Sequence, residues 1–167
     1  MSAQAVRGVL YVHSSPRALC SHVEWGIGRA LQRAVHLPWI EQPVIPGSQR
    51  AEYEWEGEPG MGAAIASQLR GWEHLRFEVT EEASAGNDAS RWMHTPDLGI
   101  FYAQIDAAGN TLVPEDRIRY AMEVAGGNAS ELQRELRLAL GQNWDDELEV
   151  FRHAGDSSPV VWMHRVS

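Results

Sequence analysis

The most site-like stretch of the chain is His13-Ser14-Ser15-Pro16-Arg17, which joins an apolar segment to a segment with helical spacing. Two hydroxyls and a guanidinium would lie there beside the backbone N–H groups of a first helical turn. This combination of groups binds anions such as phosphate or carboxylate. We therefore predict a site for a small anionic ligand, formed by His13, Ser14, Ser15 and Arg17. The alternative is a capped strand-to-helix turn in which His13 packs as a half-buried ring.

The remaining reactive residue types do not form a recognised catalytic motif. No Gly-x-Ser-x-Gly elbow and no His-Glu-x-x-His pair is present, and without any lysine the chain can form neither a Schiff base nor a P-loop. Cys20 and His22 have the spacing Cys-x-His, but on a helix their side chains diverge by about 200°. We predict no catalytic residue, no metal site and no cofactor. An enzyme that uses His13, His22 or His94 as acid or base is the third hypothesis, because histidine titrates near neutral pH.

Composition excludes several classes of protein. The 167 residues carry a formal net charge of -9, and all 14 basic residues are arginine. An acidic chain of this kind is a poor match for the clustered positive charge that nucleic-acid binding requires. The single cysteine, Cys20, rules out an internal disulfide. No signal peptide and no apolar run of about 20 residues is visible, so we expect a cytoplasmic protein with no membrane contact.

Apolar periodicity predicts the elements of the first half. Residues 6–83 have the order strand, helix, strand, strand, helix, strand, which is the pattern of a ferredoxin-like βαββαβ unit. The expected strands are 7–13, 37–44, 51–56 and 75–81, and the second helix is 61–72. Such a unit has helices on one face of its sheet and leaves the other face for solvent, for the rest of the chain or for a partner.

The second half adds further strands and helices. We expect strands at 91–94, 99–106, 111–113 and 159–166, and three helices that begin near Pro114, near Asn128 and at Asn143. Asn128 and Glu131 have the spacing of a helix N-terminal cap. Residues 90–166 are therefore predicted to pack on the first unit as a C-terminal extension. The whole chain, 1–167, is predicted to be a single α+β domain.

Several residues could contact a protein partner. Seven tryptophans are a high share for this length, and exposed tryptophan is enriched in binding hot spots. Glu52, Glu54 and Glu56 share one strand face, and we expect them to pair across the sheet with Arg76 or to form an acidic docking face. The predicted partner-binding residues are His22, Trp25, Glu52, Glu54, Arg76, Trp92 and His94.

Long strings of the chain resemble one catalogued family. They are RGVLYVHSSPRALCSHVEWGIG, RGWEHLRFEVTEEASAGNDASRW, TPDLGIFYAQIDAAGN and WDDELEVFRHAGDSSPVVWMHRV. Together they cover nearly the whole chain and resemble domain-of-unknown-function family 3145 of high-GC Gram-positive bacteria, from which the chain departs at Ser21, where proline is common. The resemblance implies a stand-alone cytoplasmic protein with an accessory role in fatty-acid or pyruvate metabolism. It implies no activity and no catalytic residue.

The leading hypothesis for function is a non-catalytic accessory or regulatory protein that binds a larger cytoplasmic metabolic enzyme. It rests on the predicted ferredoxin-like pattern, the surplus of tryptophan, the acidic strand face and the missing catalytic motifs. The alternative is a sensor of a small anionic metabolite at the His13–Arg17 segment.

Overall fold

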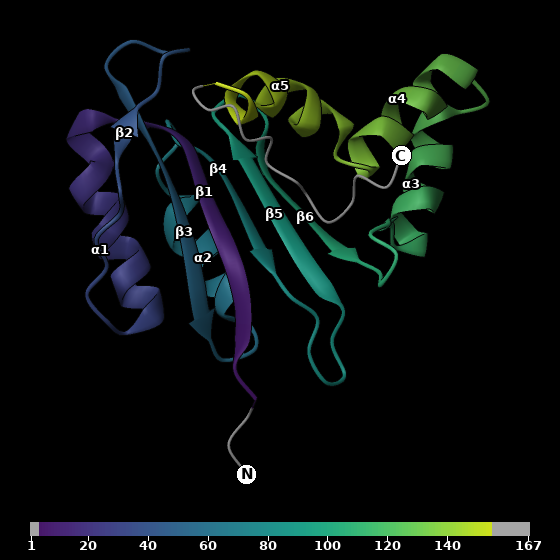
Figure 1. Cartoon of the computed structure of the whole chain (residues 1–167). Coiled ribbons are helices and arrows are strands. Elements are labelled where there is room, and N and C mark those ends of the chain that lie inside the picture. Colours follow the sequence, from purple (N-terminus) through teal and green to yellow (C-terminus); the bar gives the residue numbers. More distant parts are fainter. Residues whose placement is uncertain (1–3, 155–167) are drawn as a thin grey trace.

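One antiparallel sheet of seven strands organises the described part of the chain, where five α-helices accompany it (Figure 1). The computed structural model describes residues 4–154. The order of the strands is β2-β3-β1-β4-β5-β6-β7, and every neighbouring pair is antiparallel. The strands are β1 (Val6–Pro16), β2 (Ile40–Glu41), β3 (Ser48–Gly57), β4 (Arg76–Glu81), β5 (Ala89–Thr95), β6 (Gly99–Ile105) and β7 (Thr111–Leu112). The predicted mixture of strands and helices is thus confirmed.

Two helices cover one side of the sheet, which we call the helix face. They are α1 (Cys20–Leu31), preceded by a short 3-10 turn at Arg17–Leu19, and α2 (Met61–Leu69). Their apolar residues recur every three to four positions, so each helix presents a stripe to the sheet. These stripes meet the strands in one core, whose most buried members include Val23, Ile27, Ile65, Leu10 and Phe77.

β1 is an inner strand of the sheet, which pairs with β3 on one side and β4 on the other. Successive strand residues point to opposite faces, so Leu10 and Val12 enter the helix-face core while Val9 and Tyr11 face the other way. The strand is longer than the predicted 7–13, because it continues to Pro16. The His13–Pro16 segment is consequently part of the sheet, and α1 begins only at Cys20.

The opposite side of the sheet, which we call the open face, is only partly covered. The last helix, α5 (Gln142–Arg152), lies across one end of it, as Figure 1 shows. Trp144 and Leu148 of α5 pack there on Met93, Phe101 and Ala103 in a second, smaller core. Burying each large apolar side chain contributes about 1.5–3 kcal/mol. This contact therefore fixes α5 to the sheet, and no helix of residues 4–154 covers the other end of the open face.

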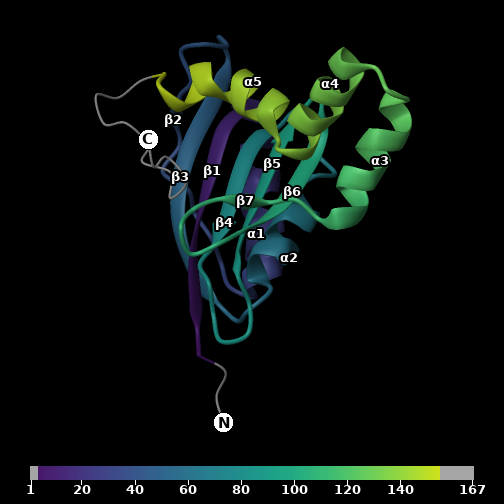
Figure 2. The same ribbon diagram turned by 90° about the vertical axis from the view of Figure 1, so that its right-hand side faces the viewer.

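A helical hairpin lies beyond β6, outside the layers of the sheet (Figures 1 and 2). It consists of α3 (Glu115–Ala125) and α4 (Ala129–Ala139), which pack on each other. Pro114 and the acids Glu115 and Asp116 open α3, as expected for a helix N-terminus. The Glu131 amide donates to the Asn128 side chain over 3.1 Å, so the predicted cap of α4 is confirmed. Among the described helices, none is long and apolar enough to cross a membrane.

Two details of the predicted sheet are wrong, and one lies beyond the described residues. The strand expected at 37–44 is reduced to the two residues of β2, where Pro38 and Pro43 flank the pairing. The expected pairing of the Glu52–Glu56 row with Arg76 does not occur, because β1 lies between β3 and β4. The strand predicted at 159–166 falls outside the described residues.

Gly8 is needed where β1 passes over Trp55. A Cβ atom added at Gly8 would lie 2.0 Å from the Thr80 carbonyl oxygen and 2.2 Å from the Trp55 ring. We therefore expect Gly8→Ala to lower the free energy of unfolding in urea by about 1–3 kcal/mol, as overpacking does. Gly71→Ala is the matched control, because a Cβ there meets nothing within 4 Å. Equal stability of the two variants would contradict this packing.

Candidate functional site

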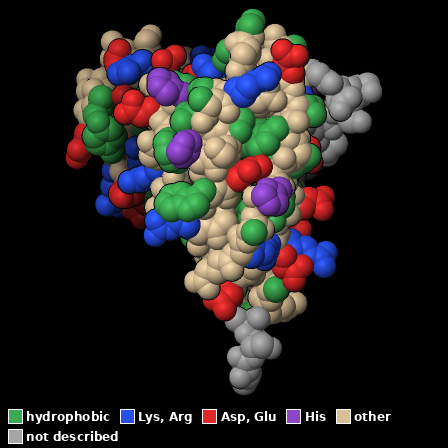
Figure 3. Space-filling view, turned by 90° about the vertical axis from the view of Figure 1, so that its left-hand side faces the viewer, with side chains coloured by type: hydrophobic (Ala, Val, Ile, Leu, Met, Phe, Trp, Pro, Cys, Tyr) green, Lys and Arg blue, Asp and Glu red, His purple; other side chains and the backbone are tan. Residues whose placement is uncertain are grey.

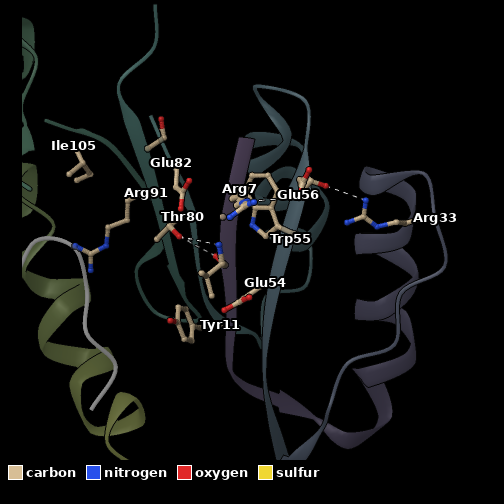
Figure 4. A pocket seen from close by; sticks show the side chains of 13 residues that line it. Arg7, Tyr11, Arg33, Glu54, Trp55, Glu56, Thr80, Glu82, Arg91 and Ile105 are labelled. Atoms are coloured by element: carbon tan, nitrogen blue, oxygen red, sulfur yellow. Dashed lines mark hydrogen bonds and ion pairs between the residues drawn. The ribbon is translucent and has the colours of Figure 1, made fainter. Parts of the chain in front are cut away.

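The candidate site is a groove on the uncovered half of the open face. It has a volume of about 630 Å³ and crosses five neighbouring strands. Side chains reach it at alternate strand positions, because strand residues point to the two faces in turn. Figure 4 shows them from β3 through β1, β4 and β5 to Ile105 of β6. The principal lining residues are Arg7, Val9, Tyr11, Glu54, Thr80 and Arg91.

A buried ion cluster separates this groove from the part of the open face that α5 covers. At its centre is Glu78 of β4, whose side chain is 0% exposed. His13 Nε2 lies 2.5 Å from one carboxylate oxygen, and Arg152 Nε donates to the same oxygen over 3.0 Å. The other oxygen accepts from Arg91 over 3.1 Å and from Arg152 over 2.6 Å. One carboxylate thus holds together β1, β4, β5 and α5.

Asp145 adds a second anion to the Glu78 cluster. Its carboxylate accepts from Arg91 over 2.7 Å and from Arg152 over 2.9 Å. Two guanidiniums therefore face two carboxylates, with His13 beside them. Burial by itself would raise the pKa of Glu78, but the hydrogen bonds and positive charges of His13 and Arg152 outweigh it and hold this pKa well below the ordinary value. Glu78 is consequently ionised and saturated with donors.

The groove itself has a negative electrostatic character. Burial and the nearby charges of Glu52, Glu78 and Glu54 raise the pKa of Tyr11 to about 12. The Tyr11 hydroxyl therefore keeps its proton at neutral pH. Tyr11 also stacks on His13, with ring centroids 6.0 Å apart, so the groove and the Glu78 cluster share a wall.

The arginines of the groove are already engaged. Arg7 Nε lies 3.9 Å from Glu56, and Arg33 of α1 donates to the Glu56 backbone oxygen over 3.2 Å, a contact visible in Figure 4. Arg91 belongs to the Glu78 cluster. By contrast, within residues 4–154 no cation pairs with Glu54 or Glu82, although both carboxylates line the groove.

The predicted anion site is divided between different environments. His13, Ser14 and Ser15 are buried, at 3%, 2% and 0% exposure, whereas Arg17 is exposed on the 3-10 turn. His13 faces Glu78, while the Ser14 hydroxyl accepts a hydrogen bond from Arg76 over 3.3 Å. A hollow of about 240 Å³ beside Ser14 is also lined by His74 and Arg76. Anion binding at this segment stays a prediction.

The predicted partner-binding residues are spread over the molecule. His22 and Trp25 are exposed on α1, on a side where hydrophobic and charged side chains are interspersed (Figure 3). Glu52 and Glu54 are exposed on the open face of β3. Trp92 and Arg76 are half-buried. His94 is buried against Phe77 on the helix face, and burial lowers its pKa.

The histidines proposed for acid–base chemistry do not come together. His13 contacts Glu78 on the open face, His94 stacks on Phe77 in the core of the other face, and His22 contacts Trp72. No group of three or more His, Cys, Asp or Glu side chains with the geometry of a metal site occurs among residues 4–154. Cys20 is a half-buried thiol whose pKa is raised by burial.

Sequence reasoning missed both the groove and the Glu78 cluster. Glu78 alternates with Phe77 and Val79, so its position alone predicts a solvent-facing carboxylate. The residues that could have indicated the burial of Glu78 lie in the helix 142–152. Asp145, Leu148 and Arg152 share one face of this helix, which therefore combines apolar and charged side chains. A charged pair within an apolar stripe indicates that the helix covers a buried ion.

The structure defines a mixed α/β protein whose sheet carries helices on one face and a half-covered groove on the other. The family model described as a protein of unknown function, DUF3145, matches residues 9–165, and the chain belongs to this family. The resemblance noted in the sequence is thereby confirmed. Neither the curated proteins nor the solved structures contain a match to the chain.

Removal of the negative charge of Glu78 should destabilise the protein strongly. Glu78→Gln leaves two buried guanidiniums with Asp145 as their one remaining shared anion, and breaking a buried ion pair in this way costs about 3–5 kcal/mol. We expect the free energy of unfolding in urea to fall by that amount. Glu123→Gln changes an exposed acid on α3 and should stay within about 0.5 kcal/mol of the wild type. A loss below about 1 kcal/mol for Glu78→Gln would show that the cluster is not needed.

The lowered pKa of Glu78 also predicts how the stability of the protein depends on pH. The pKa of Glu78 is lower in the folded protein than its ordinary value of 4.5. The ionised carboxylate therefore makes its full contribution to the free energy of unfolding above pH 4.5, and this contribution is lost as the pH falls below that value. The difference in unfolding free energy between wild type and Glu78→Gln should therefore shrink from about pH 6 to about pH 3. Urea titrations across this range measure it. A difference that does not change with pH would contradict the assignment.

Proposed function

We propose that this protein is a non-catalytic accessory protein that binds a larger cytoplasmic enzyme through the groove of the open face. The observation that carries the proposal is the groove of about 630 Å³ on the half of the sheet that α5 leaves uncovered. The walls of the groove combine the aromatic ring of Tyr11 and the aliphatic side chains of Val9 and Ile105 with charged groups. This mixture is common where proteins bind one another.

The chemistry next to the groove favours binding over catalysis. The carboxylate of Glu78 is ionised and accepts from His13, Arg91 and Arg152, so its lone pairs are occupied. Tyr11, with its pKa raised to about 12, holds its proton too tightly to act as a base or nucleophile at neutral pH. These groups supply shape and charge to the groove. Enzymes of fatty-acid or pyruvate metabolism are the first partners to test.

We also propose that the first half of the chain is a ferredoxin-like unit. The order β2-β3-β1-β4, with α1 and α2 between strands, supports this interpretation. In such a unit one sheet face is free of helices. The β5–β7 strands and α5 then extend the sheet and cover part of that free face, so that a bounded groove replaces a flat surface.

A comparison of bulky variants tests the proposed function. The tagged full chain, expressed in its native host, should co-purify with a larger enzyme in a fixed ratio. Val9→Trp fills the groove and should lower the recovered enzyme at least about tenfold, which corresponds to about 1.4 kcal/mol. Val124→Trp adds the same bulk on exposed α3 and should leave recovery unchanged.

Two results would contradict the proposal. Repeated recovery of the protein alone would remove the accessory role. Equal recovery with Val9→Trp and Val124→Trp, both shown by circular dichroism to be folded, would show that the enzyme binds elsewhere than in the groove.

A further inference from the structure

A row of carboxylates runs along β3 beside the groove. Glu52, Glu54 and Glu56 occupy alternate positions of the strand, are all exposed, and lie on the open face. Alternate residues of a strand are about 6.8 Å apart, so the row spans about 14 Å. Glu54 and Glu56 line the groove, and Glu52 continues the row toward Tyr11, its partner in the β1–β3 register. The groove thus has a regularly spaced acidic wall.

This acidic wall has more negative charge than the neighbouring arginines offset. Arg7 pairs with Glu56, but Glu52 and Glu54 have no cationic partner in the described part of the chain. Their combined field is felt at Tyr11, where it adds to burial in raising the pKa of the hydroxyl. A cationic ligand would relieve this repulsion, and an anionic ligand would increase it.

We propose that the groove binds an extended, basic segment of a partner protein. Arg or Lys side chains at alternate positions of that segment lie opposite Glu52 and Glu54. This inference rests on the proposed function and names the chemistry of the partner. The linear spacing of the acids favours an extended chain over a compact cation, because alternate side chains of an extended segment have the same repeat as the row.

Fluorescence anisotropy with a labelled peptide tests the inference on the full chain. The probe is a peptide of about eight residues in which Arg and Val alternate, matched to the strand repeat. A control peptide has the same composition, with all Arg before all Val. We expect the alternating peptide to bind at least about tenfold more tightly than the control, with affinity that falls as salt is added.

Two variants assign the contacts. Glu54→Arg should weaken binding of the alternating peptide at least about tenfold, because it replaces attraction with repulsion. Glu123→Arg makes the same charge change on α3 and should have no effect beyond about twofold. Folding of each variant is checked by circular dichroism.

Other occupants would overturn the inference. Equal binding of the two peptides, or equal affinity of Glu54→Arg and Glu123→Arg, would show that only overall charge is recognised. Full displacement by spermine at matched charge would assign the groove to a small polycation. Stronger binding of a synthetic peptide of residues 155–167 than of the probe would assign it to this chain itself.

The inference and the proposed function can fail separately. If a larger enzyme co-purifies in a groove-dependent way but the alternating peptide does not bind, the basic segment is wrong and the accessory role stands. If the peptide binds as expected but the protein is always recovered alone, the accessory role is wrong and the groove remains a site for basic segments.

Discussion

The fold depends on one buried charge, the carboxylate of Glu78. Placing an ion in the interior of a protein costs several kcal/mol, and the cost is offset only where well-placed partners surround it. Here the partners come from three other elements: His13 on β1, Arg91 on β5 and Arg152 on α5. Apolar packing of Trp144 and Leu148 can tolerate small shifts of α5, but the two-point contact of the Arg152 guanidinium cannot. The ion cluster therefore sets where α5 lies on the sheet.

The position of α5 in turn creates the groove. A helix centred over the open face would cover β1 and β4 along their whole length, whereas α5 crosses only one end (Figure 1). The strand residues left uncovered include Arg7, Glu54 and Thr80, which water solvates well, so leaving them exposed costs little. On the helix face, by contrast, Leu10, Phe77 and Val79 require full cover. The same strands thus support a dry core on one side and a wet groove on the other.

Local patterns in the sequence predicted the elements better than their arrangement. The alternation in β3, the apolar stripes of α1 and α2 and the Asn128 cap are determined by residues close together in the chain, and they were predicted. The length of β1 and its place between β3 and β4 depend on pairing between residues far apart in the chain, for which neighbouring residues carry no signal. Glu78 and Arg152 are 74 positions apart, so only the assembled fold shows why a carboxylate at an alternating position is buried. The acidic row was predicted, but the groove beside it was not.

The arrangement of charges separates structural from binding roles. Anions that hold the fold together, Glu78 and Asp145, are paired with arginine at short distances, and such pairs are costly to disturb. Glu52 and Glu54 lie two strands away, are exposed, and repel each other along β3. Because exposed carboxylates contribute little to folding, such a row is not explained by stability. It does alter the long-range field of an already acidic chain, and a field of this kind raises the rate at which a basic partner finds the groove.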